Sequence, residues 1–464
     1  MQANEEDTSV DYLTQVAEFA AQTPAEALPR TVRDKTALIL ADSIGAMAGG
    51  AVEPDVVALR NRPNLESDGP ALLIGTCRHV ARANAALLNG TAGTTLEMDE
   101  GNQFAKGHPG IHTVPAALAA VAEIGRPVSG SEFLTALTMG YEIGARVGIA
   151  ARLRAGMHPH GVWGAICSSV AVLRLMQVDA TQMRQGLNIA ASFGLTTSRR
   201  SMLEGGTVRN VYAGVSGQLG LLAADMVAAG FSGDSDGVGQ VFSQVASDAF
   251  DPEEMTRELG ERWEVSRNYF KMHSCCRFNH AALDALEMIR AEAPTLEPAQ
   301  VASVEVESYA FAAELDDPAP RNVLAGKFSV PFAIATALVN GTSGVDSFTQ
   351  DQVDDPAIRA LAAKVRVTED PAMTARLPDQ RPARVTVTLE DGQAFNAETA
   401  TNRGDWADPY TPEELRGKYL SLTARAWDDA RAAGLWDDML ALDAANDVAV
   451  LLRHLAEAVR CASD

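Results

Sequence analysis

The pattern of apolar and polar positions predicts helices along the first half of the chain. From residue 10 to about residue 249, apolar residues recur at three- and four-residue spacing, which places them on one face of a helix. Glycine and proline interrupt this pattern, and alanine and glycine are dense within it, as in closely packed helices. The clearest segments are 11–21, 31–49, 80–90, 115–125 and 130–148. We therefore expect a compact helical bundle with buried central members.

The pattern changes near Glu264. Residues 301–311 (VASVEVESYAF) and 383–395 (ARVTVTLEDGQAF) alternate apolar and polar positions, which is typical of half-buried strands. The second stretch contains the dipeptide Asp391-Gly392, a strong signal for a tight turn between two strands. Both stretches therefore predict β-structure in this part of the chain.

Helical patterns accompany these strands. Residues 281–292 and 331–338 have helical spacing, and a helical pattern returns from 412 to 461. The sequence thus predicts a mainly α protein in which a smaller α+β unit, about 266–402, interrupts a larger helical one. A cleft between two such units is a common place for a ligand.

Composition and charge narrow the class of protein. The chain has 464 residues, of which 47% are hydrophobic and 21% charged, so we expect a folded protein with two or three packing units. Its formal net charge of −23 argues against nucleic acid as a partner, because phosphate binding needs clustered Lys and Arg. An anionic substrate must then be bound by a local basic cluster.

We expect neither export nor membrane insertion. The first twenty residues are acidic and amphipathic, without the basic start and apolar run of a signal peptide. The longest apolar stretches are shorter than the roughly 20 residues that a membrane span requires. We expect a cytoplasmic protein without a membrane partner.

The densest polar cluster of the helical region is TTLEMDEGNQFAKGHPGIH, residues 94–112. Glu97, Asp99 and Glu100 place three carboxylates within four residues, and His108 and His112 follow. Carboxylates held near one another and near an imidazole can have separated pKa values, as acid and base catalysis requires. A solvated acidic turn is the alternative interpretation.

Two further clusters follow in the helical region. His158 and His160 lie in GMHPHG, where a pair of histidines suggests a metal site, but no HExxH or paired CxxC accompanies them. A hydrogen-bonded pair is the commoner outcome. Arg199, Arg200 and Arg209 lie in a glycine-rich run and have the planar fork that matches a carboxylate. Pairing of Arg199 and Arg200 with the protein's own surplus acids is the alternative.

The fourth cluster is FKMHSCCRFNH, residues 270–280. Lys271 and His273 begin it, and a partly desolvated lysine at this position can act as a base or bind an anion. Cys275 and Cys276 are adjacent, whereas a redox pair normally has two residues between its thiols, so we interpret them as packing residues. No phosphate loop or dinucleotide motif is present, and we predict neither a metal nor another cofactor.

These four clusters, in this order, resemble the MmgE/PrpD family, which includes 2-methylcitrate dehydratase, aconitate decarboxylase and iminodisuccinate epimerase. The similarity covers essentially the whole chain, and the combination of motifs is specific although each motif alone is weak. The matching segments are LADSIGAMAGG, the Asn89-Gly90 step, EMDEGNQFAKGHPGIHTVPA, GMHPH for the family's GFHPT, RNVYAG for KPLHAG, KMHSCCRF for KPYPCCRF, and KFSVPFA for FSLPYA.

The resemblance implies a fold and a reaction. It implies a large helical domain built from both chain ends, residues 1–265 and 403–464, and a smaller α+β lid domain, residues 266–402, in a homodimer. The active site would lie between the two domains and need no cofactor. The reaction would begin by removing a proton next to a carboxylate, followed by loss of water or carbon dioxide or by return of the proton to the other face.

Four positions depart from the family pattern. Arg209 replaces a lysine and removes a possible base, because guanidinium does not deprotonate in proteins. Gly101 stands where a threonine is frequent, and Phe332 where a tyrosine is usual. Cys276 stands where the aconitate decarboxylases have a histidine. These differences weigh most against decarboxylation of aconitate.

We therefore predict a lyase, a dehydratase in the first instance, that acts on a small anionic di- or tricarboxylic acid. His108 and His158 are expected to be base and acid in an order that the sequence leaves open, with Glu97 and Asp99 orienting them. Lys271 is expected to bind a carboxylate or to transfer a proton. The residues assigned to substrate binding are Arg209, Glu100, Arg199, Arg200, His273, Cys276 and Phe332.

Three alternatives stay open at this point. An epimerase of an iminodisuccinate-type acid would use the same two-base geometry without elimination. A relative that binds a metabolite without catalysis is the second alternative, because a fold alone does not establish a function. A metal hydrolase using His158 and His160 is the third.

Overall fold

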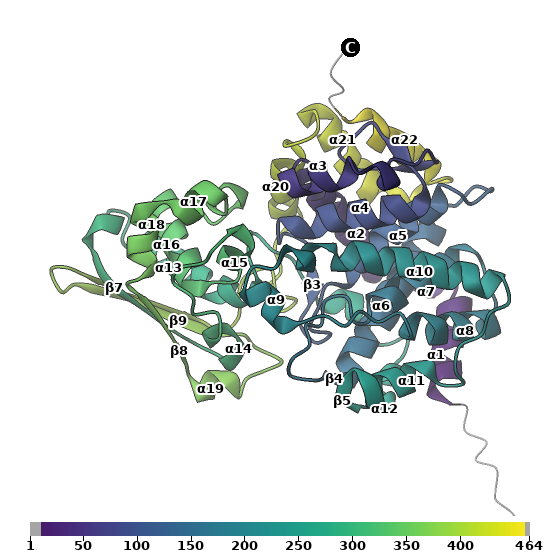
Figure 1. The fold of residues 1–464 in the computed structure, drawn as a ribbon, viewed down its shortest axis with the longest axis horizontal. Helices are drawn as coiled ribbons and strands as arrows, with labels where there is room; N and C mark the ends of the chain where they lie inside the picture. The colour runs from purple at the N-terminus through teal and green to yellow at the C-terminus, as the bar shows by residue number, and fades with distance from the viewer. Residues whose placement is uncertain (1–10, 460–464) are drawn as a thin grey trace, which may run out of the picture.

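The computed structural model describes residues 11–459 and contains one large helical part and one smaller mixed part (Figure 1). The expectations that rest on residues 1–10 and 460–464 lie outside the described residues. The chain forms mainly helices, as predicted. The helices of the first half are α1 Tyr12–Gln22, α2 Arg30–Gly50, α3 Pro54–Arg60, α4 Arg82–Thr95, α5 Pro109–Val121, α6 Gly130–Ala150, α7 Gly164–Leu175, α8 Ala180–Ala191, α9 Arg199–Leu203, α10 Tyr212–Ala228, α11 Gly237–Gln240 and α12 Pro252–Thr256.

Small residues allow the central helices to approach closely. Helices α4 and α10 meet at Gly90 and Gly214, where an added Cβ on Gly90 would lie 2.7 Å from the Gly214 backbone. Helices α6 and α7 meet at Gly144, where an added Cβ would lie 2.0 Å from the sulfur of Cys167. Larger side chains at these points would separate the helices, so the alanine- and glycine-rich composition determines the packing.

The last helices of the chain pack against the first. Helices α20 Pro412–Thr423 and α21 Asp429–Leu440 contact α2, and α22 Ala449–Glu457 follows them. Leu40 of α2 and Trp427 between α20 and α21 belong to the same hydrophobic core and are fully buried. Figure 1 shows the two ends of the colour scale, purple and yellow, within one part of the molecule.

A second hydrophobic core lies in the mixed part. Its four-stranded sheet has the order β10-β9-β7-β8, and helices α13 His280–Glu292 and α16 Val330–Asn340 contribute to the same core. The strands are β7 Val301–Ser308, β8 Val365–Glu369, β9 Ala383–Leu389 and β10 Ala394–Thr399. The short helices are α14 Ala310–Ala313, α15 Val323–Lys327, α17 Gln350–Asp354, α18 Pro356–Ala362 and α19 Pro371–Thr374.

The pairing within this sheet explains its burial. Strand β9 pairs antiparallel with both β7 and β10, and its residues alternate between buried and half-buried, so one face covers the core. Strand β8 pairs parallel with β7. The domain limits predicted at 265/266 and 402/403 stay predictions, although the two cores divide the chain in a similar way.

Three two-stranded pairings lie outside this sheet. They are β1 Ala71–Leu72 with β2 His79–Val80, β3 Gly101–Asn102 with β6 Asn268–Tyr269, and β4 Ala151–Leu153 with β5 Ser247–Phe250. The β3–β6 pairing matters most, because it joins the acidic loop after α4 to the chain that enters the mixed part.

One helical stretch of the described chain, Thr207–Ala228, is long and apolar enough to cross a membrane. Helices α2 and α3 meet the same criterion only when taken together, and they are bent by 86° relative to each other. Of the apolar window of Thr207–Ala228, 56% is buried inside the protein, which is expected of a core helix.

Candidate active site

The β3–β6 pairing brings two of the predicted clusters together. Gly101 pairs with Tyr269, so the carboxylates before β3 lie beside the lysine that follows β6. An added Cβ on Gly101 would lie 2.3 Å from the Tyr269 hydroxyl oxygen. Glycine at this position, where the family pattern has threonine, therefore leaves room for a phenol.

Four charged side chains form a buried cluster at this junction. Glu97 pairs with Nη1 of Arg209, and its Oε2 lies 3.4 Å from Nζ of Lys271. Lys271 Nζ also lies 3.5 Å from Oδ1 of Asp99 and donates to the Glu97 carbonyl at 3.1 Å. All four residues are at most 1% exposed. Two cations and two carboxylates thus balance one another away from water, as burial of charge requires.

Asp99 connects this cluster to His108. Its Oδ2 lies 3.1 Å from Nδ1 of His108, and the same nitrogen lies 2.7 Å from the Glu100 carbonyl oxygen. Because both neighbours are acceptors, Nδ1 carries the hydrogen, and Nε2 of the neutral ring is left with its lone pair. An imidazole oriented by a carboxylate in this way is the arrangement of a general base.

His158 contributes a second imidazole to the site. The backbone N–H of His160 donates to His158 Nδ1 at 3.1 Å, so the hydrogen of the neutral ring lies on Nε2. The loop is held in place by Thr197, whose hydroxyl donates to the His158 carbonyl. The His160 ring is a neighbour of both imidazoles, 5.3 Å from the His108 ring and 6.1 Å from the His158 ring, centre to centre.

Burial and neighbouring charge separate the pKa values of these groups. Burial would raise the pKa of Asp99, but His108 and Lys271 outweigh it and hold that pKa below its usual range. Burial opposes a charged Lys271, but Asp99 and Glu97 raise its pKa above the usual value. Burial, with Arg209 nearby, lowers the pKa of His158 well below its ordinary value. The site therefore holds an ionised carboxylate, a charged lysine and a neutral imidazole at neutral pH.

Glu100 points away from this cluster into the helical core. Its Oε1 accepts from the Gly110 N–H at 2.7 Å and its Oε2 from the Tyr141 hydroxyl at 2.9 Å. Burial raises the pKa of Glu100 to about 8. The sequence predicts that Glu100 binds substrate, but both oxygens of its side chain already have hydrogen-bond partners within the protein.

This raised pKa predicts a pH-dependent stability. The ordinary pKa of the group is 4.5, so its contribution to stability is complete below that pH, is lost as pH rises to about 8, and is constant above. Glu100→Gln has no charge to bury. We expect its free energy of unfolding to increase relative to the wild type between pH 5 and pH 8, measured by urea unfolding. Glu305→Gln, at an exposed position of β7, is the control. If the difference in free energy of unfolding between Glu100→Gln and the wild type does not vary with pH, Glu100 is not a buried, protonated carboxyl.

The remaining predicted residues lie in different surroundings. Arg199 pairs with Glu314 of the mixed part, and Arg200 pairs with Glu204 at an exposed position, so both arginines meet the protein's own acids. The structure thus leaves Arg200 outside the buried cluster. Cys276 lies near Glu97 and is buried, and burial, then Glu97, raises the pKa of its thiol to about 11.

His273 and Phe332 belong to the mixed part. His273 Nε2 lies 2.9 Å from Oδ1 of Asp284, and its other nitrogen bonds to Ser343. Phe332 is 1% exposed and packs against Phe348 at 5.9 Å between ring centres. Both side chains therefore have structural partners of their own.

Sequence reasoning missed three residues near this site: Tyr269, Tyr309 and Arg381. Tyr309 directly follows β7 and Arg381 precedes β9, and the register pairs Ser308 with Ala383, so the two side chains are neighbours. The β-pattern predicted both strands but contains no information on which residues of each strand face one another. That register is what places Arg381 next to Tyr309.

The alternative of a metal site at His158 and His160 depends on a third protein ligand. Within residues 11–459, no group of three or more His, Cys, Asp or Glu side chains has an arrangement that fits a metal ion. His112 and His160 face each other at 4.8 Å between ring centres, but both are fully buried. A two-histidine hydrolase site at His158 and His160 therefore lacks a third ligand.

A cavity of about 520 Å³ lies at the boundary between the two parts. Leu96 and Asn210 line it and are the chain neighbours of Glu97 and Arg209. Lys327 also lines it and bonds at 2.8 Å to the Leu96 carbonyl, and burial lowers the pKa of this lysine to about 8. This cavity therefore borders the two backbone segments that carry Glu97 and Arg209 of the buried cluster.

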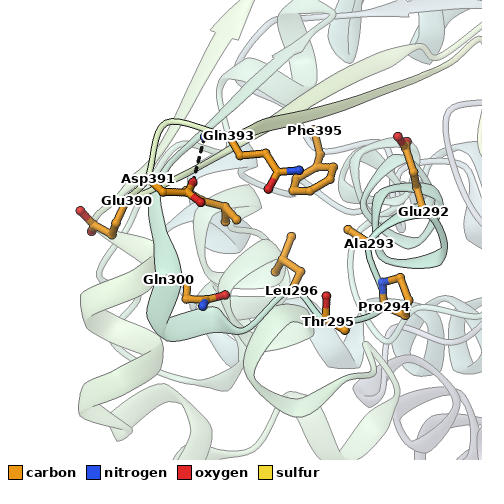
Figure 2. Close-up of a pocket in the computed structure, with 11 residues that line it drawn as sticks. Glu292, Ala293, Pro294, Thr295, Leu296, Gln300, Glu390, Asp391, Gln393 and Phe395 are labelled. Carbon is orange, nitrogen blue, oxygen red and sulfur yellow. Dashed lines mark hydrogen bonds between the residues drawn. The ribbon is translucent and has the colours of Figure 1, made fainter.

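A second cavity, of about 630 Å³, lies within the mixed part at the β9–β10 turn (Figure 2). Its charged lining residues are Glu292, Glu390 and Asp391, and none of the lining residues is basic. An anionic ligand would meet only like charge there. The cavity is therefore a poor site for a carboxylate, in contrast to the buried cluster.

The fold and the site define a two-part, mainly helical protein with a buried cluster of charged groups and imidazoles at the junction. Comparison with known proteins gives its family. Family models of the MmgE/PrpD N-terminal domain and the MmgE/PrpD C-terminal domain match residues 14–253 and 273–442. The chain belongs to the MmgE/PrpD family.

Three similar proteins have names that refer to cis-aconitate decarboxylase. The cis-aconitate decarboxylase of Aspergillus terreus is 24% identical over 471 residues, covering 95% of each chain. A cis-aconitate decarboxylase-like protein of Aspergillus oryzae is 26% identical and covers 92% of this chain and 93% of the relative. The cis-aconitate decarboxylase of Mus musculus is 23% identical and covers 80% and 78%. Decarboxylases are lyases, so the family supports a lyase.

Proposed function

We propose that this protein is a cofactor-independent hydro-lyase that removes a proton next to a carboxylate of a small di- or tricarboxylic acid. One observation carries the proposal. His108, clamped at Nδ1 by Asp99 and the Glu100 carbonyl, lies beside the buried cations Lys271 and Arg209. A base next to a carboxylate-binding pair of cations is what this chemistry requires.

The geometry supports the following division of roles. The carbon–hydrogen bond next to the carboxylate breaks, and its proton goes to His108 Nε2. The electron pair forms a carbon–carbon double bond, and the hydroxyl group leaves as water with the proton that His108 Nε2 has just taken. The Nε2–H of the neutral His158 ring donates a hydrogen bond to the departing oxygen. Arg209 and Lys271 stabilise the negative charge that develops on the carboxylate in the transition state. Transfer of this proton to the departing hydroxyl returns His108 to its starting state.

Glu97 has a separate role in this proposal. It holds Arg209 and Lys271 together, so a substrate carboxylate must share these cations with it. Glu97 also has a φ of 55°, in the left-handed region that non-glycine residues rarely adopt. Strain of this kind is concentrated at functional sites, where the surrounding structure maintains it.

Decarboxylation is the second candidate, because the relatives are named cis-aconitate decarboxylases. Loss of carbon dioxide would leave an electron pair on carbon, and a protonated His108 would supply the proton. Cys276 in place of a histidine and Arg209 in place of a lysine weigh against this reaction. The homodimer and the cytoplasmic location stay predictions.

A metal-free incubation in deuterated water, followed by proton NMR, tests the proposal. The panel is 2-methylcitrate, citrate, cis-aconitate, malate and iminodisuccinate. We expect loss of water from one of these acids, in the presence of a chelator. Loss of carbon dioxide would favour the decarboxylase, and exchange or inversion without an alkene would favour an epimerase. Binding without any conversion would indicate a metabolite-binding relative and contradict the proposal.

A further inference from the structure

Arg381 is a buried cation without a carboxylate partner. It is 7% exposed, and its Nη2 donates at 3.2 Å to the Gln103 carbonyl. Its Nε has no hydrogen-bond partner among the residues that the structure describes. Within residues 11–459, no Asp or Glu forms an ion pair with it. Burying an unpaired guanidinium is unfavourable, and this chain has an excess of acids available for pairing. The position is therefore expected to serve an anion that the protein itself does not supply.

A second unsatisfied group lies beside this guanidinium. The Arg381 guanidinium carbon is 5.8 Å from the centre of the Tyr309 ring. The buried Tyr309 hydroxyl interacts with Arg381, but within the described part of the chain it has no acceptor for its own hydrogen. Phe278 covers Arg381 on another side, at 5.4 Å from its ring centre. A guanidinium and a phenol hydroxyl are both donors, so together they fit an acceptor such as a carboxylate.

Nearby charges do not balance Arg381. Arg277 is also buried, but it pairs with Asp405 and bonds to Asn402, so its charge is already neutralised. Burial, and next the proximity of Arg381, lowers the pKa of Arg277, which places the two guanidinium groups near each other. Asp405 thus balances only Arg277, and the positive charge of Arg381 is left over.

Tyr269 connects this region to the catalytic base. The Arg277 guanidinium carbon lies 3.9 Å from the centre of the Tyr269 ring, and that ring lies 6.3 Å from the His108 ring. Gln103, which accepts from Arg381, belongs to the loop between β3 and His108. Arg381 is therefore adjacent to the proposed active site. It belongs to a group of side chains separate from that of Arg209 and Lys271.

We propose that Arg381 and the Tyr309 hydroxyl bind a second carboxylate of the substrate. The site then selects acids that carry carboxylates at two ends over monocarboxylic acids. This inference rests on the proposed function, which needs the first carboxylate at Arg209 and Lys271. Arg381 belongs to the mixed part and Gln103 to the helical part, so a bound carboxylate at Arg381 would also join the two parts.

Calorimetric titration with tricarballylate, a saturated tricarboxylic acid without a hydroxyl group to lose, tests the inference. Arg381→Gln should weaken tricarballylate binding by about tenfold or more, as expected for lost charge-assisted hydrogen bonds. Affinity for butyrate, with a single carboxylate, should stay within about threefold of the wild type. Arg381→Lys, which keeps the charge but not the fork, should give an intermediate loss. Arg384→Gln, which removes an arginine of the same strand that pairs with Glu307 and Glu398, is the control.

Thermal unfolding without ligand separates binding from a structural role. Because the charge of Arg381 is unbalanced, Arg381→Gln should have the wild-type Tm or a higher one in the absence of ligand. Tricarballylate should raise the Tm of the wild type but not that of Arg381→Gln. A lower Tm without ligand together with unchanged tricarballylate affinity would overturn the inference, as would a wild type that does not bind tricarballylate.

The two proposals can fail separately. Arg381-dependent binding of tricarballylate by a protein that converts no acid of the panel would support this subsite and contradict the lyase. Turnover with the same KM in wild type and Arg381→Gln would support the lyase and overturn the subsite.

Discussion

His108→Asn should lower the turnover number by about two to four powers of ten, the usual contribution of a general base. Asparagine retains an N–H that can donate to the Glu100 carbonyl, so the loop keeps its hydrogen bond while the proton acceptor is lost. The measurement is kcat on the acid that the wild type converts. His454→Asn is a matched control, because His454 also presents Nδ1 to a carboxylate, at 2.7 Å from Asp438, but at an exposed position.

The control variant should keep wild-type turnover. The same substitution at His158 should also reduce kcat strongly, since His158 is the second imidazole of the site. Wild-type turnover in both His108→Asn and His158→Asn would contradict the roles proposed for the two imidazoles.

Lys271→Met should lower the free energy of unfolding by about 3–5 kcal/mol, the cost of removing one partner of a buried charge pair. Lys271 contacts both Glu97 and Asp99, and all three are at most 1% exposed. Its loss leaves only Arg209 to balance two carboxylates. Urea unfolding at neutral pH measures the change.

Two further variants test this explanation. Lys364→Met removes a half-exposed lysine 3.5 Å from Glu390 and should cost about 0–1 kcal/mol through that ion pair. Asp99→Asn added to Lys271→Met should recover part of the lost stability, because one uncompensated carboxylate is removed. If Lys271→Met costs no more than Lys364→Met, the buried ion-pair cluster does not stabilise the fold as described.

The helices were predictable because their signal is long. The pattern at 31–49 corresponds to α2, Arg30–Gly50, and the pattern at 281–292 to α13, His280–Glu292. Strand β8, Val365–Glu369, was not predicted, because five residues carry little periodicity and its partner β7 is parallel and distant in sequence. Spacing along a chain indicates an element, whereas the pairing between elements depends on tertiary structure.

The same distinction holds for the site. Glu97, Asp99, His108 and Lys271 were identified as residue types that can carry acid–base chemistry, and the structure brings them together. The two-residue pairing of β3 with β6 that joins them has no sequence signature. Arg381 was overlooked because it lies alone before a strand, outside any cluster of polar residues. Only its burial and its lack of a counter-ion among the described residues indicate that it binds an anion.

Cleavage of the carbon–hydrogen bond next to a carboxylate is the central claim, and proton NMR in deuterated water tests it most directly. Wild type and His108→Asn would be incubated in parallel, without metal, with the acid of the panel that the wild type converts. We expect the wild type to remove this proton and release water, and His108→Asn to leave the proton signal almost unchanged over the same time. Loss of the proton at equal rates in both proteins would contradict it.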